Sequence, residues 1–322
     1  MRHLFATMLA VMAVCGSAFA DPQNWKREGW RTDFDRTTVD LNDVISGGPP
    51  RDGIPAIDRP EFRAANEISD IGAQEPVIRL EVGGEVRAYP VRVLMWHEIA
   101  NDTVAGIPVT VTYCPLCNSA IVFDRRVNGA TLDFGTTGKL RNSDLVMYDR
   151  QSDSWWQQFN GEAIAGTYAG TRLTMLASRM EPFGAFFAEN PGAKVLVPDG
   201  THIRDYGRNP YVGYDTAERP FLYNGSMPEG IEPMARVIVV RGDTDPLVVT
   251  FEHLRSRGEL KIGNTLLTWE QGQNSALDAS RISEGRDVGT VKVTQGGKDA
   301  VFDVTFAFVA HAFHPGSGIL GK

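Results

Sequence analysis

Residues 77–89 read VIRLEVGGEVRAY, and this stretch decides the class of fold. Apolar and polar residues alternate on both sides of Gly83-Gly84, as they do when a two-residue turn joins two half-buried strands. Pro90 follows directly and opens an apolar run to Ile99, a pattern typical of a helix with proline in its first turn. A strand hairpin that leads into a helix predicts an α+β protein that is mainly antiparallel β.

A cysteine pair lies between the next two predicted strands. Residues 109–113 and 120–123 are apolar and rich in β-branched or aromatic side chains, and Cys114-Pro-Leu-Cys117 separates them. Asn128-Gly129 then predicts a second two-residue hairpin turn. We therefore expect the cysteines on a tight loop between strands, with no helix starting at Cys117. That expectation argues against a thioredoxin fold, in which the motif opens a helix.

The N-terminus predicts export. Residues 1–20 carry Arg2, an apolar run and a small-residue site that ends in Ala18-Phe19-Ala20, which together are typical of a secretory signal peptide cleaved near Ala20. We expect a periplasmic or secreted protein with no integral membrane segment in the mature chain. The net charge of −8, with no basic run, argues against nucleic-acid binding.

The sequence also suggests an internal duplication. Residues at a constant spacing pair Pro90 with Pro246, His97 with His253, Asn118 with Asn274, Arg125 with Arg281 and Gly129 with Gly285. In the second copy Glu270 and Gln273 stand where the cysteines would be. We expect two diverged copies of one module, packed about a pseudo-two-fold axis as a single domain. The expected parts are an N-terminal arm (21–74), a first module (75–160), a connecting region (161–235) and a second module (236–316).

The cysteine pair allows three kinds of chemistry. Cys114 and Cys117 could act as a redox dithiol, with Cys114 as the attacking thiol, on an unknown protein or small-molecule thiol or disulfide partner. They could instead hold a soft metal, copper or zinc, with His97 as a third ligand, because His97 precedes the strand that leads to Cys114. In the redox case His97 is the candidate base. A structural disulfide is the third alternative.

Two polar segments supply candidate walls for a site. The first, residues 135–144, contributes Lys139, Arg141 and Asp144. The second, a loop rich in tyrosine and arginine between the modules, contributes Arg204, Asp205, Tyr206 and Asn209. The sequence assigns no role to His202, His311 or His314.

Three further segments carry a family resemblance. Residues 113–125 (YCPLCNSAIVFDR), 138–151 (GKLRNSDLVMYDRQ) and 155–166 (WWQQFNGEAIAG) resemble the bacterial exported family catalogued as domain of unknown function 3179, as does the loop from Arg204 to Tyr211. The resemblance spans about residues 70–315. It implies an exported, β-containing scaffold that carries the motif at Cys114 and Cys117, and it implies no activity.

The interpretation that the sequence favours is a periplasmic thiol protein with reversible redox chemistry, such as a thiol-disulfide oxidoreductase of non-thioredoxin fold. A copper- or zinc-binding protein that uses the same cysteines is the alternative from another class. A scaffold that binds a partner or small molecule and carries a structural disulfide is the third.

Overall fold

Antiparallel strand pairs dominate the architecture, as the hairpin signals predict. The computed structural model describes residues 22–242 and 245–322, so the predicted signal peptide lies outside the described residues. Within these residues the strands form five sheets of four or five strands and one small hairpin. Helices are few and short: α1 (Pro22–Arg27), α2 (Val91–His97), α3 (Phe183–Glu189), α4 (Phe251–Arg255) and α5 (Ala307–Phe313). The chain is therefore an α+β protein with mainly antiparallel β structure.

Two sheets are built from the first half of the chain. One has the order β14 (Thr174–Leu176), β7 (Ser119–Asp124), β6 (Ile107–Cys114), β5 (Ile99–Val104). The other has the order β15 (Ser178–Pro182), β3 (Pro76–Val82), β4 (Glu85–Pro90), β16 (Lys194–Val197), β2 (Glu61–Ala64). Strand β16 runs parallel to β4, and every other neighbouring pair in these two sheets is antiparallel.

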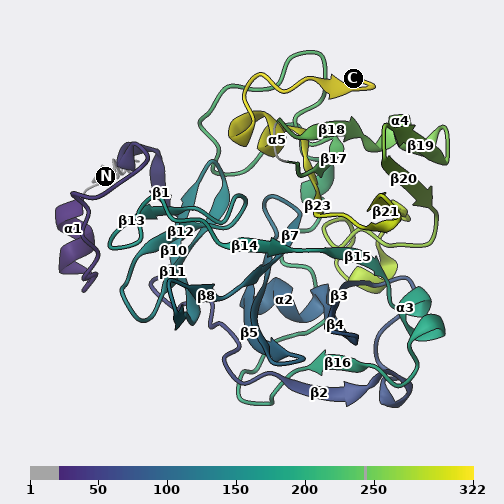
Figure 1. Cartoon of the computed structure of the whole chain (residues 1–322), viewed down its shortest axis with the longest axis horizontal. Helices are drawn as coiled ribbons and strands as arrows, with labels where there is room; N and C mark the ends of the chain where they lie inside the picture. The colour runs from purple at the N-terminus through teal and green to yellow at the C-terminus, as the bar shows by residue number, and fades with distance from the viewer. Residues whose placement is uncertain (1–21, 243–244) are drawn as a thin grey trace, which may run out of the picture.

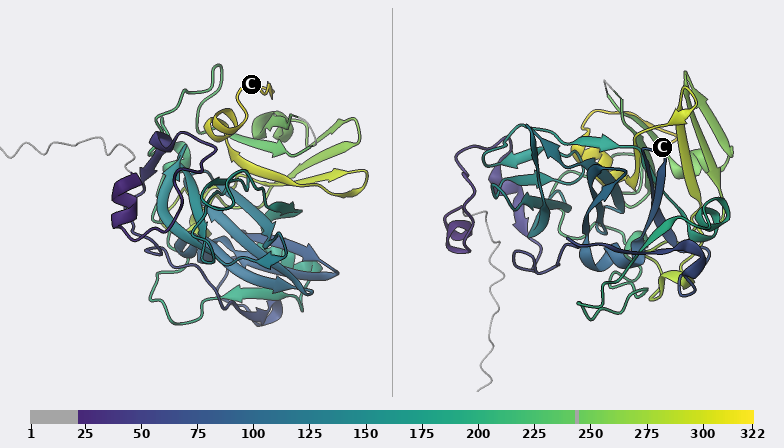
Figure 2. Two further views of the ribbon diagram at one scale, coloured as in Figure 1. Left: turned by 60° about the vertical axis from the view of Figure 1, so that its left-hand side comes forward. Right: turned by 60° about the horizontal axis from the view of Figure 1, so that its bottom comes forward.

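A third sheet and two C-terminal sheets complete the fold. The third sheet has the order β1 (Val44–Ser46), β10 (Phe134–Arg141), β11 (Asp144–Asp149), β12 (Trp155–Gln157), β13 (Ala163–Ala165). The C-terminal sheets are β23 (Phe302–Phe306), β17 (Arg236–Val240), β18 (Leu247–Thr250), β24 (Ile319–Leu320), and β19 (Glu259–Ile262), β20 (Thr265–Glu270), β21 (Thr290–Gln295), β22 (Lys298–Asp299). The third sheet and the β19–β22 sheet lie toward opposite ends of the molecule (Figures 1 and 2).

The predicted turns are confirmed. Gly83 and Gly84 have φ of 59° and 81° between β3 and β4, and Asn128 and Gly129 have φ of 50° and 84° between β8 (Arg126–Val127) and β9 (Ala130–Thr131). Two successive positive φ values define the hairpin turn whose twist matches that of the strands. The Cys114–Cys117 loop is a tight turn between β6 and β7, and no helix follows it.

The two halves share a strand order. The sheet order β15-β3-β4-β16 is repeated as β23-β17-β18-β24, with the last strand parallel to its neighbour in both. The order β14-β7-β6-β5 is likewise repeated as β22-β21-β20-β19. Helices α2 and α4 follow the equivalent strands β4 and β18, and helices α3 and α5 follow β15 and β23. Residues 125–173 are inserted in the first half, and residues 271–289 replace the short cysteine loop in the second.

The predicted residue correspondence is wrong, however. Pro90 is the N-cap of α2, but the N-cap of α4 is Thr250, whereas Pro246 stands just before β18. The Thr250 side chain accepts a hydrogen bond from His253 N. Threonine thus caps α4 where proline precedes α2, and the two equivalent positions do not match in sequence. The first half is also not continuous between 75 and 160, because β14, β15 and β16 belong to its sheets.

The N-terminal arm packs on the third sheet. Trp25 and Trp30 are buried against Trp155, with ring centroids 4.8 Å and 5.1 Å away. The arm adds β1 to this sheet and β2 to the sheet of β3 and β4. It therefore ties two sheets together. Among the described residues no helix is long and apolar enough to cross a bilayer.

Candidate functional site

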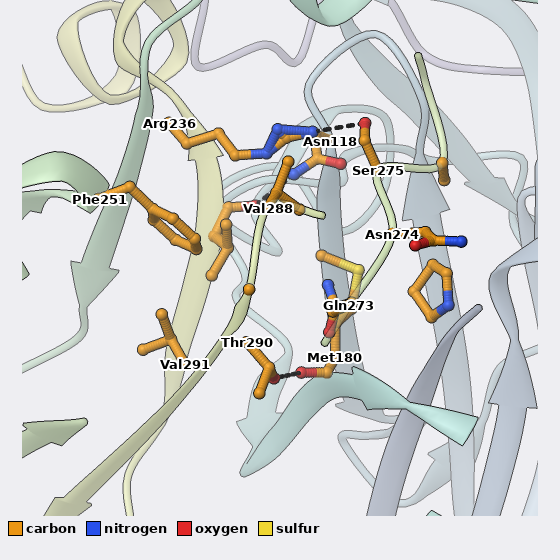
Figure 3. Close-up of a pocket in the computed structure, with 14 residues that line it drawn as sticks. Asn118, Met180, Arg236, Phe251, Gln273, Asn274, Ser275, Val288, Thr290 and Val291 are labelled. Carbon is orange, nitrogen blue, oxygen red and sulfur yellow. Dashed lines mark hydrogen bonds between the residues drawn. The ribbon is translucent and has the colours of Figure 1, made fainter. Parts of the chain in front are cut away.

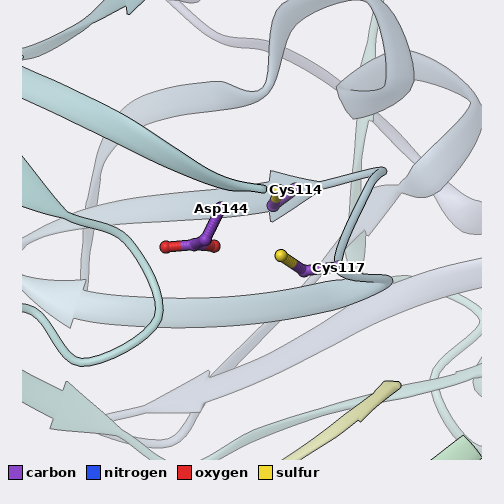
Figure 4. Close-up of side chains that lie close together, drawn as sticks. All are labelled: Cys114, Cys117 and Asp144. Atoms are coloured by element: carbon purple, nitrogen blue, oxygen red, sulfur yellow. The ribbon is translucent and has the colours of Figure 1, made fainter. Parts of the chain in front are cut away.

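Two tight turns bring a carboxylate onto the cysteine pair. Cys114 ends β6 and Cys117 lies in the turn to β7, where Cys117 N donates to Cys114 O (3.2 Å). Asn142 and Ser143, with φ of 54° and 64°, form the turn from β10 into β11. This second turn places Asp144, the first residue of β11, beside both thiols (Figure 4). The insertion that is found only in the first half thus supplies the third group of the cluster.

Cys114, Cys117 and Asp144 form a buried, incompletely bonded cluster. One potential ligand atom from each residue lies within 4.8 Å of the others. Asp144 Oδ2 accepts hydrogen bonds from Gln157 Nε2 (2.6 Å) and Phe159 N (2.9 Å). Its second oxygen, Oδ1, is buried and accepts no hydrogen bond of good geometry from the described residues, so the only donors near this carboxylate besides Gln157 and Phe159 are the two weakly donating thiols. Both sulfur atoms also approach Ser143 O, at 3.8 Å and 3.6 Å.

Burial controls the proton affinities in this cluster. It raises the pKa of the Cys114 thiol and raises the pKa of the Cys117 thiol well above its ordinary value. Burial also raises the pKa of Asp144 to about 6. Desolvation penalises each charged form, so without a cation the thiols stay protonated at neutral pH. A bound metal ion would reverse this preference, because it stabilises thiolate and carboxylate.

His97 does not join the cluster. Its Nδ1 lies 2.7 Å from Pro55 O and its Nε2 lies 2.7 Å from the Tyr206 hydroxyl. The carbonyl can only accept, so Nδ1 carries the proton and Nε2 accepts from Tyr206. Both ring nitrogens are used, and the ring stacks on Tyr206. The structure thus joins His97 to Tyr206 and places His202 beside them, apart from the ligand group of the cysteines and Asp144.

The other predicted wall residues are dispersed. Lys139 pairs with Glu28 (2.9 Å), and Arg141 lies 3.9 Å from Asp43. Asn209 Nδ2 donates to Ala279 O (3.1 Å). Arg204 and Asp205 line an open cavity of about 520 Å³ with Met95, Trp96 and Tyr211.

The histidines near the chain end also lie elsewhere. His311 lies 3.0 Å from the Ser226 hydroxyl, and His314 Nε2 accepts from Arg241 (3.0 Å).

Glu98 interacts electrostatically with Asp144 and Cys114, and sequence reasoning missed it. It is the residue after α2 and has φ of 58°. Burial raises the pKa of its carboxyl to about 8, and the charge of Asp144 acts in the same direction. A glutamate within the apolar run 93–100 is a signal that the sequence offered, because buried carboxylates are rare and are often found at functional sites.

A small cavity behind the cysteine loop is not a ligand site. Asn118, which follows Cys117, lines it together with Arg236 and Ser275 from the second half (Figure 3). Its volume of about 20 Å³ leaves room for roughly one water molecule. The cavity marks where the two halves meet.

Asp303, on β23, makes the stability of this region pH-dependent. It accepts hydrogen bonds from Ser119 Oγ (2.6 Å) and Ala120 N (3.2 Å) at the end of the cysteine loop. Burial raises the pKa of Asp303 to about 7, from an ordinary 3.8. Its contribution to stability is therefore present below about pH 4 and is lost as the pH rises through about 7.

We expect Asp303→Asn to remove roughly 3 kcal/mol of the stability difference between pH 5 and pH 8. Urea unfolding at the two pH values measures this difference, and the exposed Asp35→Asn is the control that should leave it unchanged. An unaltered difference in Asp303→Asn would show that Asp303 is ionised in the folded protein throughout this range.

Fold and site together define a mainly antiparallel β protein with a buried thiol–carboxylate cluster. The chain matches the family model described as "Protein of unknown function (DUF3179)" over residues 51–317. It belongs to this family, in agreement with the resemblance seen in the sequence. No curated protein and no solved structure matches the chain.

Proposed function

We propose that this protein binds one zinc ion through Cys114, Cys117 and Asp144 and leaves a fourth coordination position open. The observation that carries the proposal is the buried cluster of two sulfurs and one carboxylate within 4.8 Å of one another, in which Asp144 Oδ1 accepts no hydrogen bond of good geometry from the described residues. A buried polar atom without a partner is destabilising by about 1–3 kcal/mol. A metal ion at this point would satisfy the oxygen and both thiolates together.

The donor set favours zinc over copper(I). Thiolate and carboxylate are both ordinary zinc ligands, and zinc sites with three protein ligands keep a position for water or substrate. Copper(I) prefers soft sulfur donors, so a carboxylate is a poor third ligand for it. Two thiolates and one carboxylate carry three negative charges, of which the ion neutralises two.

Reversible dithiol chemistry has weaker support. The two sulfur atoms lie within 4.8 Å of one another, and both cysteines are free. Yet Cys114 is 2 % exposed and Cys117 is fully buried, so neither offers a sulfur to a protein partner. Raised thiol pKa values also reduce the thiolate fraction that exchange requires.

The test is metal content and affinity. Protein purified without chelators is expected to carry about one equivalent of zinc by mass spectrometry, and competition with a chromophoric chelator gives its affinity. Cys114→Ser/Cys117→Ser is expected to bind none and still to fold, because the second half forms the same strand order without these cysteines. Ser226→Ala, outside the cluster, is the control.

Two results would refute the zinc proposal. One is wild-type protein that stays metal-free after incubation with zinc under reducing conditions. The other is a double variant that binds zinc as tightly as wild type. A disulfide between Cys114 and Cys117 in freshly isolated protein, with no affinity for zinc after reduction, would favour the redox interpretation.

Export is part of the proposal. A signal peptide over residues 1–20 would deliver the chain to an oxidising compartment, where a vicinal pair of free thiols tends to close. Bound zinc would keep both thiols ligated. Mass spectrometry of protein from separated cell fractions tests this, since export requires a mature chain that starts near Asp21.

We also propose that the two halves arose by duplication of one unit. The shared strand order supports this, as does the repeat of Asn190-Pro191-Gly192 after α3 by His314-Pro315-Gly316 after α5. The C-caps Asn190 and His314 have nearly the same backbone angles, φ −135° and ψ 58° against φ −133° and ψ 60°. The proposed zinc site then lies where the halves differ, which is typical of function added to a scaffold.

A further inference from the structure

We propose that the cavity between α2 and the loop 203–211 binds a small organic carboxylate, with its apolar part against Trp96 and Tyr211 and its carboxylate on Arg204. This site is separate from the proposed zinc site, because none of the three proposed zinc ligands lines the cavity. Three observations support the inference: the apolar walls of the cavity, an arginine without an ion pair, and a loop that is held by both halves of the chain.

The walls of this cavity are largely apolar and aromatic. Its volume is about 520 Å³, and the apolar residues that line it are Ile54, Met95, Trp96, Ile203, Pro210 and Tyr211. Ile203 is 96 % exposed, so nearly all of its apolar surface faces water. Cavities of about 300–1,000 Å³ with such walls hold small organic molecules, and exposed apolar residues beside a cavity mark a binding site.

Arg204 supplies a cation to the same cavity. It makes no ion pair with any residue that the structure describes, and its guanidinium donates one hydrogen bond, to Ile203 O (3.1 Å). Asp205, which also lines the cavity, has a cation of its own, because its Oδ2 lies 3.7 Å from Arg208 Nη1. A guanidinium offers five N–H donors in a planar fork that fits a carboxylate. An apolar molecule with one carboxylate therefore complements this cavity.

A second large cavity, of about 600 Å³, shows the contrast. Three arginines line it, and each already has a carboxylate partner: Arg236 and Arg286 pair with Asp215, both at 2.8 Å, and Arg255 pairs with Glu252 at 2.7 Å. An anion in that cavity would have to compete with these carboxylates. The cavity beside α2 is therefore the better of the two for an anionic ligand.

The loop that forms one wall of the cavity is held by both halves of the chain. Toward the first half, the Tyr206 hydroxyl donates to Nε2 of His97 (2.7 Å), the last residue of α2. Toward the second half, Asn209 is 1 % exposed and its N–H donates to Ser280 O (2.9 Å). A wall that is fixed before binding loses little conformational freedom when a ligand binds, so more of the interaction free energy contributes to affinity.

The test compares small carboxylates with their uncharged amides, and ligand-observed NMR on the purified protein measures binding. The probes are phenylacetate, isovalerate and octanoate, each paired with its primary amide, which has a similar shape and no charge. At least one carboxylate is expected to bind with a dissociation constant in the millimolar range or below. Its affinity should exceed that of its amide about 10-fold, because a hydrogen bond between two charged groups is stronger than one to a neutral acceptor.

Two arginine variants locate the site. Arg204→Gln is expected to remove the preference, so that the acid and its amide bind equally. Arg219→Gln is the matched control, since Arg219 is an exposed arginine that does not line the cavity, and it should leave the preference unchanged. Equal binding of acids and amides by wild type, an unchanged preference in Arg204→Gln, or no binding of any probe at about 10 mM would overturn the inference. These outcomes do not depend on zinc, so they are distinct from a failure of the zinc proposal.

Discussion

Asp144→Asn is expected to lower the affinity for zinc at least 100-fold. Residues that merely support a metal ligand contribute 10–100-fold to affinity, so loss of a ligand should exceed that range. Asparagine has the same shape, and its amide oxygen can accept the bonds that Gln157 Nε2 and Phe159 N now donate to Oδ2. The change therefore removes the charge at Oδ1 with little disturbance of the packing.

In the metal-free protein the same substitution should stabilise the fold at pH 8. Burial raises the pKa of Asp144 to about 6, so above that pH a buried negative charge with no cation beside it opposes folding. Asparagine carries no charge and escapes this penalty. If Asp144→Asn is more stable than wild type without metal and binds zinc more weakly, the Asp144 carboxylate serves metal binding and not folding.

Chelator competition and urea unfolding in the presence and absence of zinc measure the two effects. Asp149→Asn is the matched control, since Asp149 is a buried aspartate at the other end of β11 whose partners are Ser152 and Trp156. It should leave the affinity for zinc unchanged. Equal affinities of Asp144→Asn and wild type would remove Asp144 from the site.

Local turn chemistry made part of the fold predictable. Gly83-Gly84 and Asn128-Gly129 demand the positive φ values that the structure has, and proline before Val91 marks the start of α2. Pairing between distant strands has no comparable local signal, so the sequence did not reveal that β14, β15 and β16 join the sheets of the first half.

The site was predictable only in part. The cysteines are adjacent in sequence, and their turn follows from the flanking strands. Which side chain lies beside them depends on a turn more than twenty residues further along the chain. Proximity in sequence pointed to His97, whereas the structure ties His97 to Pro55 and Tyr206. Asp144 was named as a wall residue, but its approach depends on the turn at Asn142 and Ser143.

The strand order that both halves share separates what folding needs from what the site needs. In the first half, β6 and β7 are joined by the short cysteine turn, beside which the insertion places Asp144. In the second half, residues 271–289 join the equivalent strands, and Ser275 and Arg286 from this segment bind Asp215. Ion pairs and hydrogen bonds thus stabilise the connection formed by residues 271–289. For the cysteine turn in the first half we propose that a metal ion has this role.

Asp215→Ala is accordingly expected to destabilise the protein by about 3–5 kcal/mol. The Asp215 side chain is fully buried and accepts from Arg236 Nη2 and Arg286 Nη2, both at 2.8 Å. Arg236 is itself only 9 % exposed at its side chain. In Asp215→Ala the positive charge of Arg236 would stay buried without the carboxylate of Asp215. The unfavourable desolvation of that charge accounts for the expected loss of stability.

Urea unfolding of Asp215→Ala and Arg286→Ala tests this reasoning. Arg286 is 40 % exposed at its side chain, so water can replace part of its interaction, and Arg286→Ala should lower the stability by about 1 kcal/mol or less. Zinc affinity should be unchanged in both variants under conditions where they are folded, because neither residue touches the cysteine cluster. Equal destabilisation by the two substitutions would contradict the role of the buried Arg236. Loss of zinc binding in a folded Asp215→Ala protein would show that the second half controls the site in the first.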